Sequence, residues 1–298
     1  MDLRASLPSF KFCDVAYAGR AVALAQWHQN HQFCSKCGSG TTSIFGGAKR
    51  QCLQNPLHRH YPRTDPVIIT LVILDTPTPT SDDTHTTRSS SNQRISKEKV
   101  LLGRSKGLPP GTLTCLSGFI DQGESIEEAV VREVKEESGV AVHSVEILGS
   151  QPWPIGRGGS CELMIGCIAR TSSEALVIDY SEMEECRWVD KEEVLEALKN
   201  SLNPESPFIN RGKSRGGGQI SSVSAAAAAA GGGGGGAAAG GGESVSVGRA
   251  VQDNRTSLSS SVLYVPPPYA IAHHLLKYWA ENKVETRGGH PIPQSNKL

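Results

Sequence analysis

Hydrophobic and polar positions along the chain predict alternating helices and strands. Residues 67–74 (VIITLVIL) form a β-branched run with the length and composition of a buried strand. Residues 14–30 place Ala, Val, Leu and Trp27 on one side of a predicted helix. Further strands are predicted at residues 100–102, 113–116, 142–149, 163–169 and 185–189.

The clearest helix signal lies between Ser125 and Gly139. Ser125 followed by Glu128 three residues later has the pattern of a capping box, and Gly139 suits the left-handed end of a helix. Ile126, Val130 and Val134 follow at intervals of four residues, so they form a stripe that can pack on a sheet. A second capped helix is predicted to begin at Asp190, with Glu193, and to run to about Lys199. A terminal helix is predicted after the prolines at 266–268.

Two low-complexity segments interrupt this pattern. Residues 76–98 are rich in Ser, Thr and Pro, and residues 201–261 contain runs of Ala and Gly with many serines. Such compositions bury too little apolar surface to offset the entropy of ordering the chain. Both segments are therefore expected to be long disordered insertions without chemistry of their own.

Composition excludes some classes of protein. The chain has 298 residues with 30 Lys and Arg against 30 Asp and Glu, so net charge points to neither nucleic acid nor membrane. No apolar run approaches the length of a membrane span, and the first 20 residues lack the apolar stretch of a secretory signal. The eight cysteines do not form a compact disulfide framework, which favours metal binding or core positions.

Three glutamates on the predicted helix give the first indication of chemistry. Glu133, Glu136 and Glu137 are spaced so that their carboxylates share one sector, where like charges repel unless a hard cation such as Mg²⁺ takes them as ligands. Arg132 can reach Glu136 or orient a neighbouring carboxylate by a bidentate bond. Taken alone, the three glutamates also fit an ordinary solvated helix face.

Residues 118–140, GFIDQGESIEEAVVREVKEESGV, resemble the signature of the Nudix hydrolases with every defining position filled. The resemblance implies an α/β (α+β) fold, a Nudix α/β/α sandwich with a mixed sheet, and hydrolysis of diphosphates with Mg²⁺ or Mn²⁺. It implies that Glu133, Glu136, Glu137 and a downstream glutamate, Glu182 by spacing, hold the ions. The backbone carbonyl of Gly118 is a further expected contact.

Other segments resemble the NADH pyrophosphatase branch of that family. SQPWP at 150–154, HYPRTDP at 60–66, the Cys-x-x-Cys segment after Phe33 and residues 265–276 carry this resemblance. It implies cleavage of NADH or NAD⁺ to AMP and nicotinamide mononucleotide. The branch has a further N-terminal domain, of which residues 1–32 are interpreted as a helical remnant. A zinc ribbon at 33–63 and a Nudix domain at 64–298 complete the expected organisation.

The SQPWP segment is expected to recognise the substrate. Trp153 offers a flat apolar face to a base or nicotinamide ring, the prolines stiffen a loop, and Ser150 and Gln151 can bond ring or ribose edges. By the resemblance, Ala272 lies near the bound nucleotide. The family motif continues with Phe-Pro, whereas this chain has Ile155-Gly156, so one ring contact is in doubt.

Cys34, Cys37 and Cys52 have the spacing of a zinc ribbon whose fourth cysteine is missing. His58 or His60 can complete a Cys₃His set for structural Zn²⁺, and His58 is favoured because His60 adjoins the Tyr-Pro-Arg segment. The alternative is a degenerate ribbon held together by packing without metal.

Several alternatives remain open at this point. The substrate can instead be the NAD cap of RNA, ADP-ribose or another dinucleotide, and a catalytically silent nucleotide-binding module is a third hypothesis. The final Asn296-Lys297-Leu298 resembles a peroxisomal address, so a peroxisomal location is expected rather than a cytoplasmic one. The resemblance also includes homodimers, although nothing in the sequence independently indicates one.

Overall fold

The computed structural model describes residues 12–75, 98–154, 156, 160–210, 262–281 and 290–291. Most of the two predicted insertions, 76–98 and 201–261, lies outside the described residues. The exceptions are Glu98 and the stretch from 201 to 210, which ends in the short helix α5 (Pro207–Asn210). Ser201 and Ser206 are buried there, so the predicted start of the second insertion at 201 was too early.

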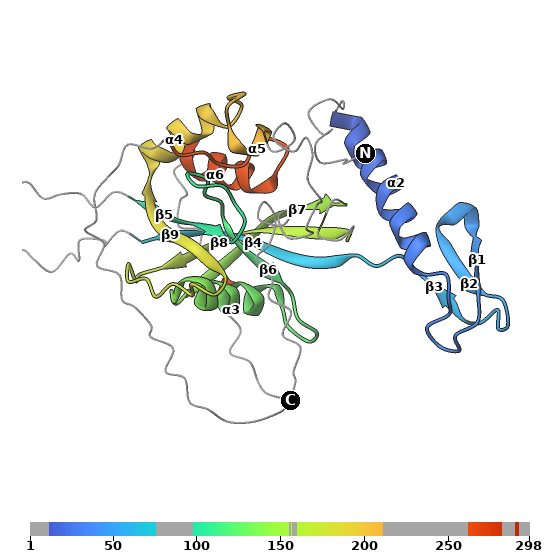
Figure 1. Cartoon of the computed structure of the whole chain (residues 1–298). Coiled ribbons are helices and arrows are strands. Elements are labelled where there is room, and N and C mark those ends of the chain that lie inside the picture. Colours follow the sequence, from blue (N-terminus) through green and yellow to red (C-terminus); the bar gives the residue numbers. More distant parts are fainter. Residues whose placement is uncertain are drawn as a thin grey trace, which may run out of the picture.

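A helix and a small antiparallel sheet form the N-terminal part, which extends to the right of the larger body in Figure 1. The helix α2 begins two residues earlier than predicted and ends at the expected residue. The sheet has the order β1-β2-β3. The bounds are α2 Phe12–Asn30, β1 Thr41–Ile44, the 3-10 turn η2 Phe45–Gly47, β2 Lys49–Cys52 and β3 Arg59–His60.

The larger body is built on a seven-stranded sheet of order β10-β7-β8-β4-β5-β9, with β6 paired to β4. β4 and β8 are parallel, and the other described pairs are antiparallel, which confirms the predicted mixed sheet. The strands are β4 Asp65–Leu74, β5 Lys99–Ser105, β6 Leu116–Phe119, β7 Ser144–Trp153, β8 Glu162–Thr171, β9 Met183–Asp190 and β10 His290–Pro291.

Helices cover both faces of this sheet, as expected for an α/β/α sandwich (Figure 1). Ile68 and Val72 of β4 pack in the core layer beneath α3. Ile69 and Leu71 point the other way, into the layer formed with α4 and α6. The continuous apolar run in β4 follows from this burial on both faces. The helices are α3 Ile126–Ser138, α4 Lys191–Asn200 and α6 Ile271–Glu281.

Two local predictions need correction. The SQPWP segment is not a loop up to Trp153, because Ser150 to Trp153 form the end of β7 and pair with β8. Asp190 precedes α4 without a side-chain capping bond, and the Glu193 carboxylate accepts a hydrogen bond from Arg187 at 2.6 Å. Among the described helices, none is long and apolar enough to cross a bilayer.

Candidate active site and metal centres

Both ends of α3 are fixed as the sequence predicted. The Ser125 hydroxyl accepts a hydrogen bond from the Glu128 backbone, and the Glu128 carboxylate accepts one from the Ser125 backbone. Gly139 ends the helix with φ of 75°, in the left-handed region. Val130 and Val134 are fully buried against the sheet, so the opposite sectors of α3 are held in fixed directions.

The structure brings the four predicted glutamates together. Glu133 and Glu137 are buried, with 6% and 1% of their surfaces exposed, whereas Glu136 points outward from the same helix. Glu182 lies in the turn before β9, and its charge acts on both buried carboxyls. Gly118 leaves the necessary room, because a Cβ there would lie 1.9 Å from the carboxyl carbon of Glu133.

Burial changes the acidity of two of these carboxyls. Burial raises the pKa of Glu133 to about 7, and the nearby charges of Glu136 and Glu182 add to it against the opposing effect of Arg132. The pKa of Glu137 is raised well above its ordinary value, first by burial and then by the charges of Glu133 and Glu182. One oxygen of Glu137 is buried without a hydrogen-bond partner. Clustered carboxylates with an unpartnered buried oxygen fit a hard divalent cation.

Arg132 connects the cluster to the preceding loop. It forms a bidentate pair with Glu124, at 2.8 Å to each oxygen, and donates to Glu133 at 2.7 Å and Glu136 at 3.2 Å. It also donates to the backbone carbonyl of Phe119 at 2.9 Å. The hydrogen bonds from Arg132 lower the pKa of Glu124. The sequence interpretation gave Glu124 no role, although its position eight residues before Arg132 in the motif was a usable signal.

The ribbon gathers a second candidate metal centre. The ligand atoms of Cys34, Cys37, Cys52 and His58 all lie within 4.8 Å of one another. The Cys37 and Cys52 sulfurs are 3.5 Å apart, and Nδ1 of His58 lies 3.6 Å from the Cys34 sulfur. Hydrogen bonds, first from the Ser39 backbone, lower the pKa of Cys37 to about 6, which favours the thiolate that zinc requires.

The geometry distinguishes His58 from His60. The ring of His58 faces the Cys34 sulfur with Nδ1, and its Nε2 lies 3.2 Å from the Asn55 side chain. His60 belongs to β3 and is not part of this group. Three thiols and one imidazole within this distance fit a closed tetrahedral zinc site.

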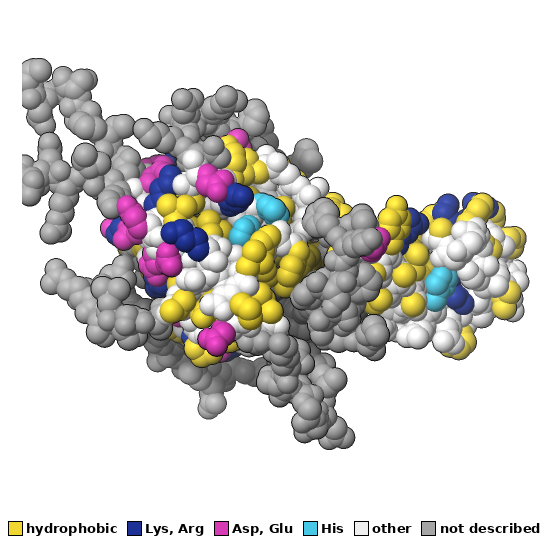
Figure 2. Space-filling model, turned by 90° about the horizontal axis from the view of Figure 1, so that it is seen from above, with side chains coloured by type: hydrophobic (Ala, Val, Ile, Leu, Met, Phe, Trp, Pro, Cys, Tyr) yellow, Lys and Arg dark blue, Asp and Glu magenta, His cyan; other side chains and the backbone are white. Residues whose placement is uncertain are grey.

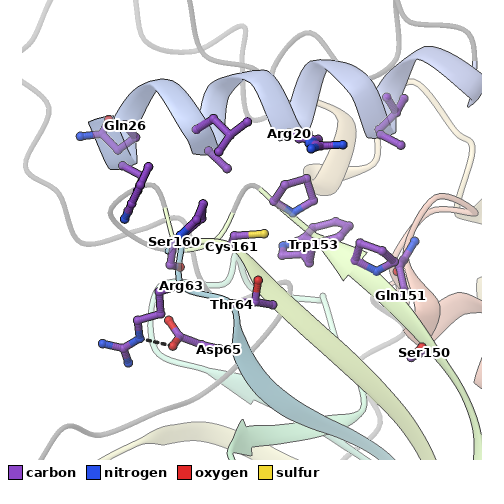
Figure 3. Close-up of a pocket in the computed structure, with 18 of the residues that line it drawn as sticks. Arg20, Gln26, Arg63, Thr64, Asp65, Ser150, Gln151, Trp153, Ser160 and Cys161 are labelled. Carbon is purple, nitrogen blue, oxygen red and sulfur yellow. Dashed lines mark hydrogen bonds and ion pairs between the residues drawn. The ribbon is translucent and has the colours of Figure 1, made fainter. Parts of the chain in front are cut away.

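A cavity of about 950 Å³ lies between α2 and the edge of the large sheet (Figure 3). Ser150, Gln151 and Trp153 line it, together with Arg63 and Asp65 from the entry to β4. None of the four glutamates belongs to its lining. The cavity, which α2 and the ribbon help to line, is therefore separate from the carboxylate cluster of the Nudix domain.

The side chains of the SQPWP segment are largely engaged by the fold. Gln151 donates to the Tyr269 carbonyl and accepts from the Ile271 backbone, each at 2.8 Å, and so fixes the start of α6. Trp153 is only 6% exposed and belongs to the core, so it does not present an open ring face. Ala272 is fully buried and borders a separate void of about 10 Å³, because it faces the core from the first turn of α6.

Comparison with known protein families agrees with both centres. The NUDIX domain matches residues 92–211, and the NADH pyrophosphatase zinc ribbon domain matches residues 29–61. The chain therefore contains a Nudix domain, preceded by a zinc ribbon of the kind found in NADH pyrophosphatases.

Three relatives illustrate the similarity. The human NAD-capped RNA hydrolase NUDT12 is 40% identical over 65% of this chain and 38% of its own length. Nudix hydrolase 19, chloroplastic, of Arabidopsis thaliana is 33% identical over 89% of this chain and 52% of its own. The human mitochondrial NAD(P)H pyrophosphatase NUDT13 is 36% identical over 67% of this chain and 50% of its own. The chain thus spans about half the length of these relatives or less.

Proposed function

We propose that the chain hydrolyses the diphosphate bond of NADH or NAD⁺ and releases AMP and the corresponding nicotinamide mononucleotide. The observation that carries this proposal is the buried carboxylate cluster on α3, with its unpartnered Glu137 oxygen. The cluster occurs in a chain whose ribbon matches that of NADH pyrophosphatases. The carboxylate cluster supports the type of reaction, and the match of the ribbon supports the type of substrate.

The proposed role of the glutamates is to hold Mg²⁺ or Mn²⁺ against the substrate. When bound, such ions neutralise the diphosphate and lower the pKa of a coordinated water. In this proposal Glu133, Glu136, Glu137 and Glu182 supply the carboxylates, and Gly118, which lies against the Glu133 carboxyl, supplies its backbone carbonyl. Arg132 positions Glu133 and Glu136 through its hydrogen bonds. One glutamate of the cluster is proposed to accept the proton from the attacking water.

The large cavity supports a dinucleotide substrate. Asp65 of β4 lines the cavity. Further along the same strand, Ile68 pairs with Gly118, which lies next to the Glu133 carboxylate. Three residues along a strand span about 10 Å. One half of a dinucleotide can therefore enter the cavity while its diphosphate lies near the cluster. Ser150, Gln151 and Trp153 shape the wall, and Gln151 contributes by holding the start of α6.

The proposed zinc site is structural. Cys34, Cys37, Cys52 and His58 would supply all four ligands of a bound Zn²⁺, which would then stabilise the ribbon rather than activate a water. This assignment leaves the chemistry to the carboxylate cluster.

A second substrate is favoured by the relatives. Several are named NAD-capped RNA hydrolases, so removal of the NAD cap from RNA is the main alternative to free NADH. ADP-ribose or another dinucleotide is a less specific alternative. A catalytically silent module is disfavoured because all four glutamates are present and converge.

A substrate panel tests the proposal. The protein is incubated with Mg²⁺ or Mn²⁺ and equal concentrations of NADH, NAD⁺, ADP-ribose or NAD-capped RNA, and AMP or decapped RNA is quantified. The expected result is metal-dependent AMP release from NADH or NAD⁺ that exceeds the release from ADP-ribose. Efficient cleavage of ADP-ribose with none of the nicotinamide substrates would contradict the proposed specificity.

Location and assembly stay predictions from the sequence. The tail Asn296-Lys297-Leu298 lies outside the described residues, and two of the relatives are named as chloroplastic or mitochondrial. These names give no support to a peroxisomal address. A fluorescent fusion ending in this tail, compared with one lacking Leu298, tests the address, and sedimentation of the purified chain tests the homodimer.

A further inference from the structure

One stretch of the chain carries a charge imbalance that its overall composition conceals. Residues 15–64, which cover most of α2 and the whole ribbon, contain six Lys and Arg and not a single Asp or Glu. At the average acidic content of the chain, 30 in 298, a stretch of this length would contain about five. With Zn²⁺ on three thiolates and one imidazole, the metal site itself contributes one negative charge. The α2–ribbon region, defined as residues 15–64, therefore stays net positive.

The surface of the ribbon also presents aromatic side chains to solvent. Phe45 is 70% exposed and Tyr61 is 57% exposed. The Lys49 ammonium group lies between them, 5.1 Å from the centre of the Phe45 ring and 4.8 Å from that of Tyr61. In the view of Figure 2, the ribbon end at the right shows basic, histidine and hydrophobic side chains without acidic ones. We call Phe45, Lys49 and Tyr61 the aromatic–lysine surface.

The fold does not account for this surface. Phe45 adopts a φ of 50°, a strained conformation for a residue other than glycine, while its ring stays out of the core. Arg50, next to Lys49, is different, because it binds Thr41 twice and His28 once and so ties the ribbon to α2. Neighbouring cations thus have separate tasks: Arg50 stabilises the fold, and Lys49 lies between two exposed rings.

We propose that the aromatic–lysine surface binds single-stranded RNA, so that the chain acts on the NAD cap of an RNA body held on the ribbon. Exposed rings on which bases stack, set in a positively charged surface that follows the phosphates, are how proteins bind single strands without sequence preference. The cap-removal part of this inference rests on the proposed diphosphate hydrolysis, whereas RNA binding by the ribbon does not.

The position of the surface agrees with this assignment. Ala48 and Pro62 line the large cavity, and their sequence neighbours Lys49 and Tyr61 belong to the aromatic–lysine surface. Arg63, also in the cavity lining, continues the basic character toward β4. An RNA whose cap occupies the cavity can therefore pass directly onto the ribbon. The chain offers charge complementarity to a phosphate backbone there, which a second copy of the same basic surface does not.

The test measures RNA binding and catalysis separately. Full-length, zinc-loaded protein is compared with the double variant Phe45→Ala/Tyr61→Ala and with Lys49→Glu. Lys199→Glu is the matched control, because it makes the same charge change at an exposed position at the end of α4. Binding of a fluorescent, uncapped single-stranded RNA is followed by anisotropy at two salt concentrations. Hydrolysis of NADH and removal of the cap from the same RNA are measured in parallel.

The double variant is expected to weaken RNA binding at least about tenfold, because each stacked base contributes substantially. Lys49→Glu should weaken binding and reduce its dependence on salt, while Lys199→Glu should leave both unchanged. Cap removal at low RNA concentration should fall in proportion to binding. NADH hydrolysis should stay within about twofold of the wild type, and unchanged zinc content and melting temperature show that the variants fold.

Three results would overturn the inference. The first is wild-type protein that hydrolyses NADH and does not bind the RNA. The second is RNA binding by the double variant with unchanged affinity. The third is a change from dimer to monomer in the double variant with unaltered RNA binding, which would assign the surface to a second copy. If the wild type binds RNA through this surface yet cleaves no dinucleotide, the proposed hydrolysis fails and the RNA site stands.

Discussion

The ribbon and the Nudix domain hold their charged centres in opposite ways. Within the described residues of the ribbon, the buried apolar side chains are those of Cys34 and Cys52, while Phe33, Leu53 and Leu57 are exposed. The Nudix domain has two extensive core layers, and it buries Glu133 and Glu137 on the side of the sheet that α3 covers. We therefore expect the ribbon to depend on a bound metal for its fold, whereas the Nudix domain has a core large enough to tolerate buried carboxyls. The difference predicts which changes break structure and which break only chemistry.

The largest expected effect is loss of the ribbon after removal of zinc. Cys34→Ser removes a buried ligand, and structural zinc in small domains contributes about 10–16 kcal/mol of apparent binding free energy. Zinc content should fall from one equivalent toward zero, and rapid hydrogen exchange should be confined to the ribbon. Cys161→Ser is the control, because this thiol is outside the metal group. Stoichiometric zinc in Cys34→Ser would refute the assigned ligand set.

His58→Ala and His60→Ala separate the two candidate fourth ligands. Zinc affinity should fall in the His58 variant, whose ring faces the Cys34 sulfur, and should be nearly unchanged in the His60 variant. A competition titration with a chromophoric chelator measures both. The reverse order of affinities would transfer the fourth position to His60.

Substitution in the carboxylate cluster should break chemistry and leave the fold intact. Glu136→Gln and Glu137→Gln are each expected to lower kcat by about 10²–10⁴-fold, because a metal ligand or proton acceptor is lost. Glu146→Gln, at an exposed position of β7, should keep wild-type activity. Steady-state kinetics with NADH, together with circular dichroism, checks the three variants. Wild-type activity in both cluster variants would remove the metal-site assignment.

A smaller effect concerns pH. The pKa of Glu133 is raised from about 4.5 to about 7, so between these values the folded state binds more protons than the unfolded state. The free energy of unfolding of the metal-free protein should therefore fall as the pH rises through this range, by up to about 3 kcal/mol. Glu133→Gln should flatten the dependence, and Mg²⁺ should stabilise the wild type more at pH 8 than at pH 6. Thermal denaturation at both pH values tests this, and a stability that rises from pH 5 to 7 without metal would contradict the sign.

The smallest effect is expected at Gln151. Gln151→Ala removes two hydrogen bonds to the start of α6 and should lower the free energy of unfolding by about 1–2 kcal/mol. Because Ile271 lines the cavity, KM for the dinucleotide should rise more than kcat falls. Ser150→Ala, which leaves α6 in place, is the comparison. Equal stability of the Gln151 variant and the wild type would show that this link is not important.

The sequence was most informative where local rules agree with tertiary packing. Ser125 and Glu128 fix the start of α3 by a capping box, and Gly139 fixes its end by a left-handed conformation. Both signals depend only on residues that are close together in the sequence. The β-branched run at 67–74 likewise predicts a strand buried on both faces, and Ile68 and Ile69 do point into the two different core layers.

Contacts between distant segments were not predictable in the same way. Gln151 was expected to bond a nucleotide, but it bonds residues near 270, which no local pattern indicates. Trp153 was assigned to a loop because prolines flank it, yet pairing with β8 extends β7 through it. Only the folded structure separates Lys49 from Arg50, since the two differ in what surrounds them and not in their charge.

The proposed reaction is metal-dependent cleavage of a nicotinamide dinucleotide at the carboxylate cluster. The most direct measurement is AMP release from NADH by wild type and Glu137→Gln, side by side, over a titration with Mn²⁺. We expect saturable, chelator-sensitive AMP release by the wild type, and a loss of at least about 100-fold in a variant that remains folded. AMP release that is independent of metal, or equal in the two proteins, would contradict it.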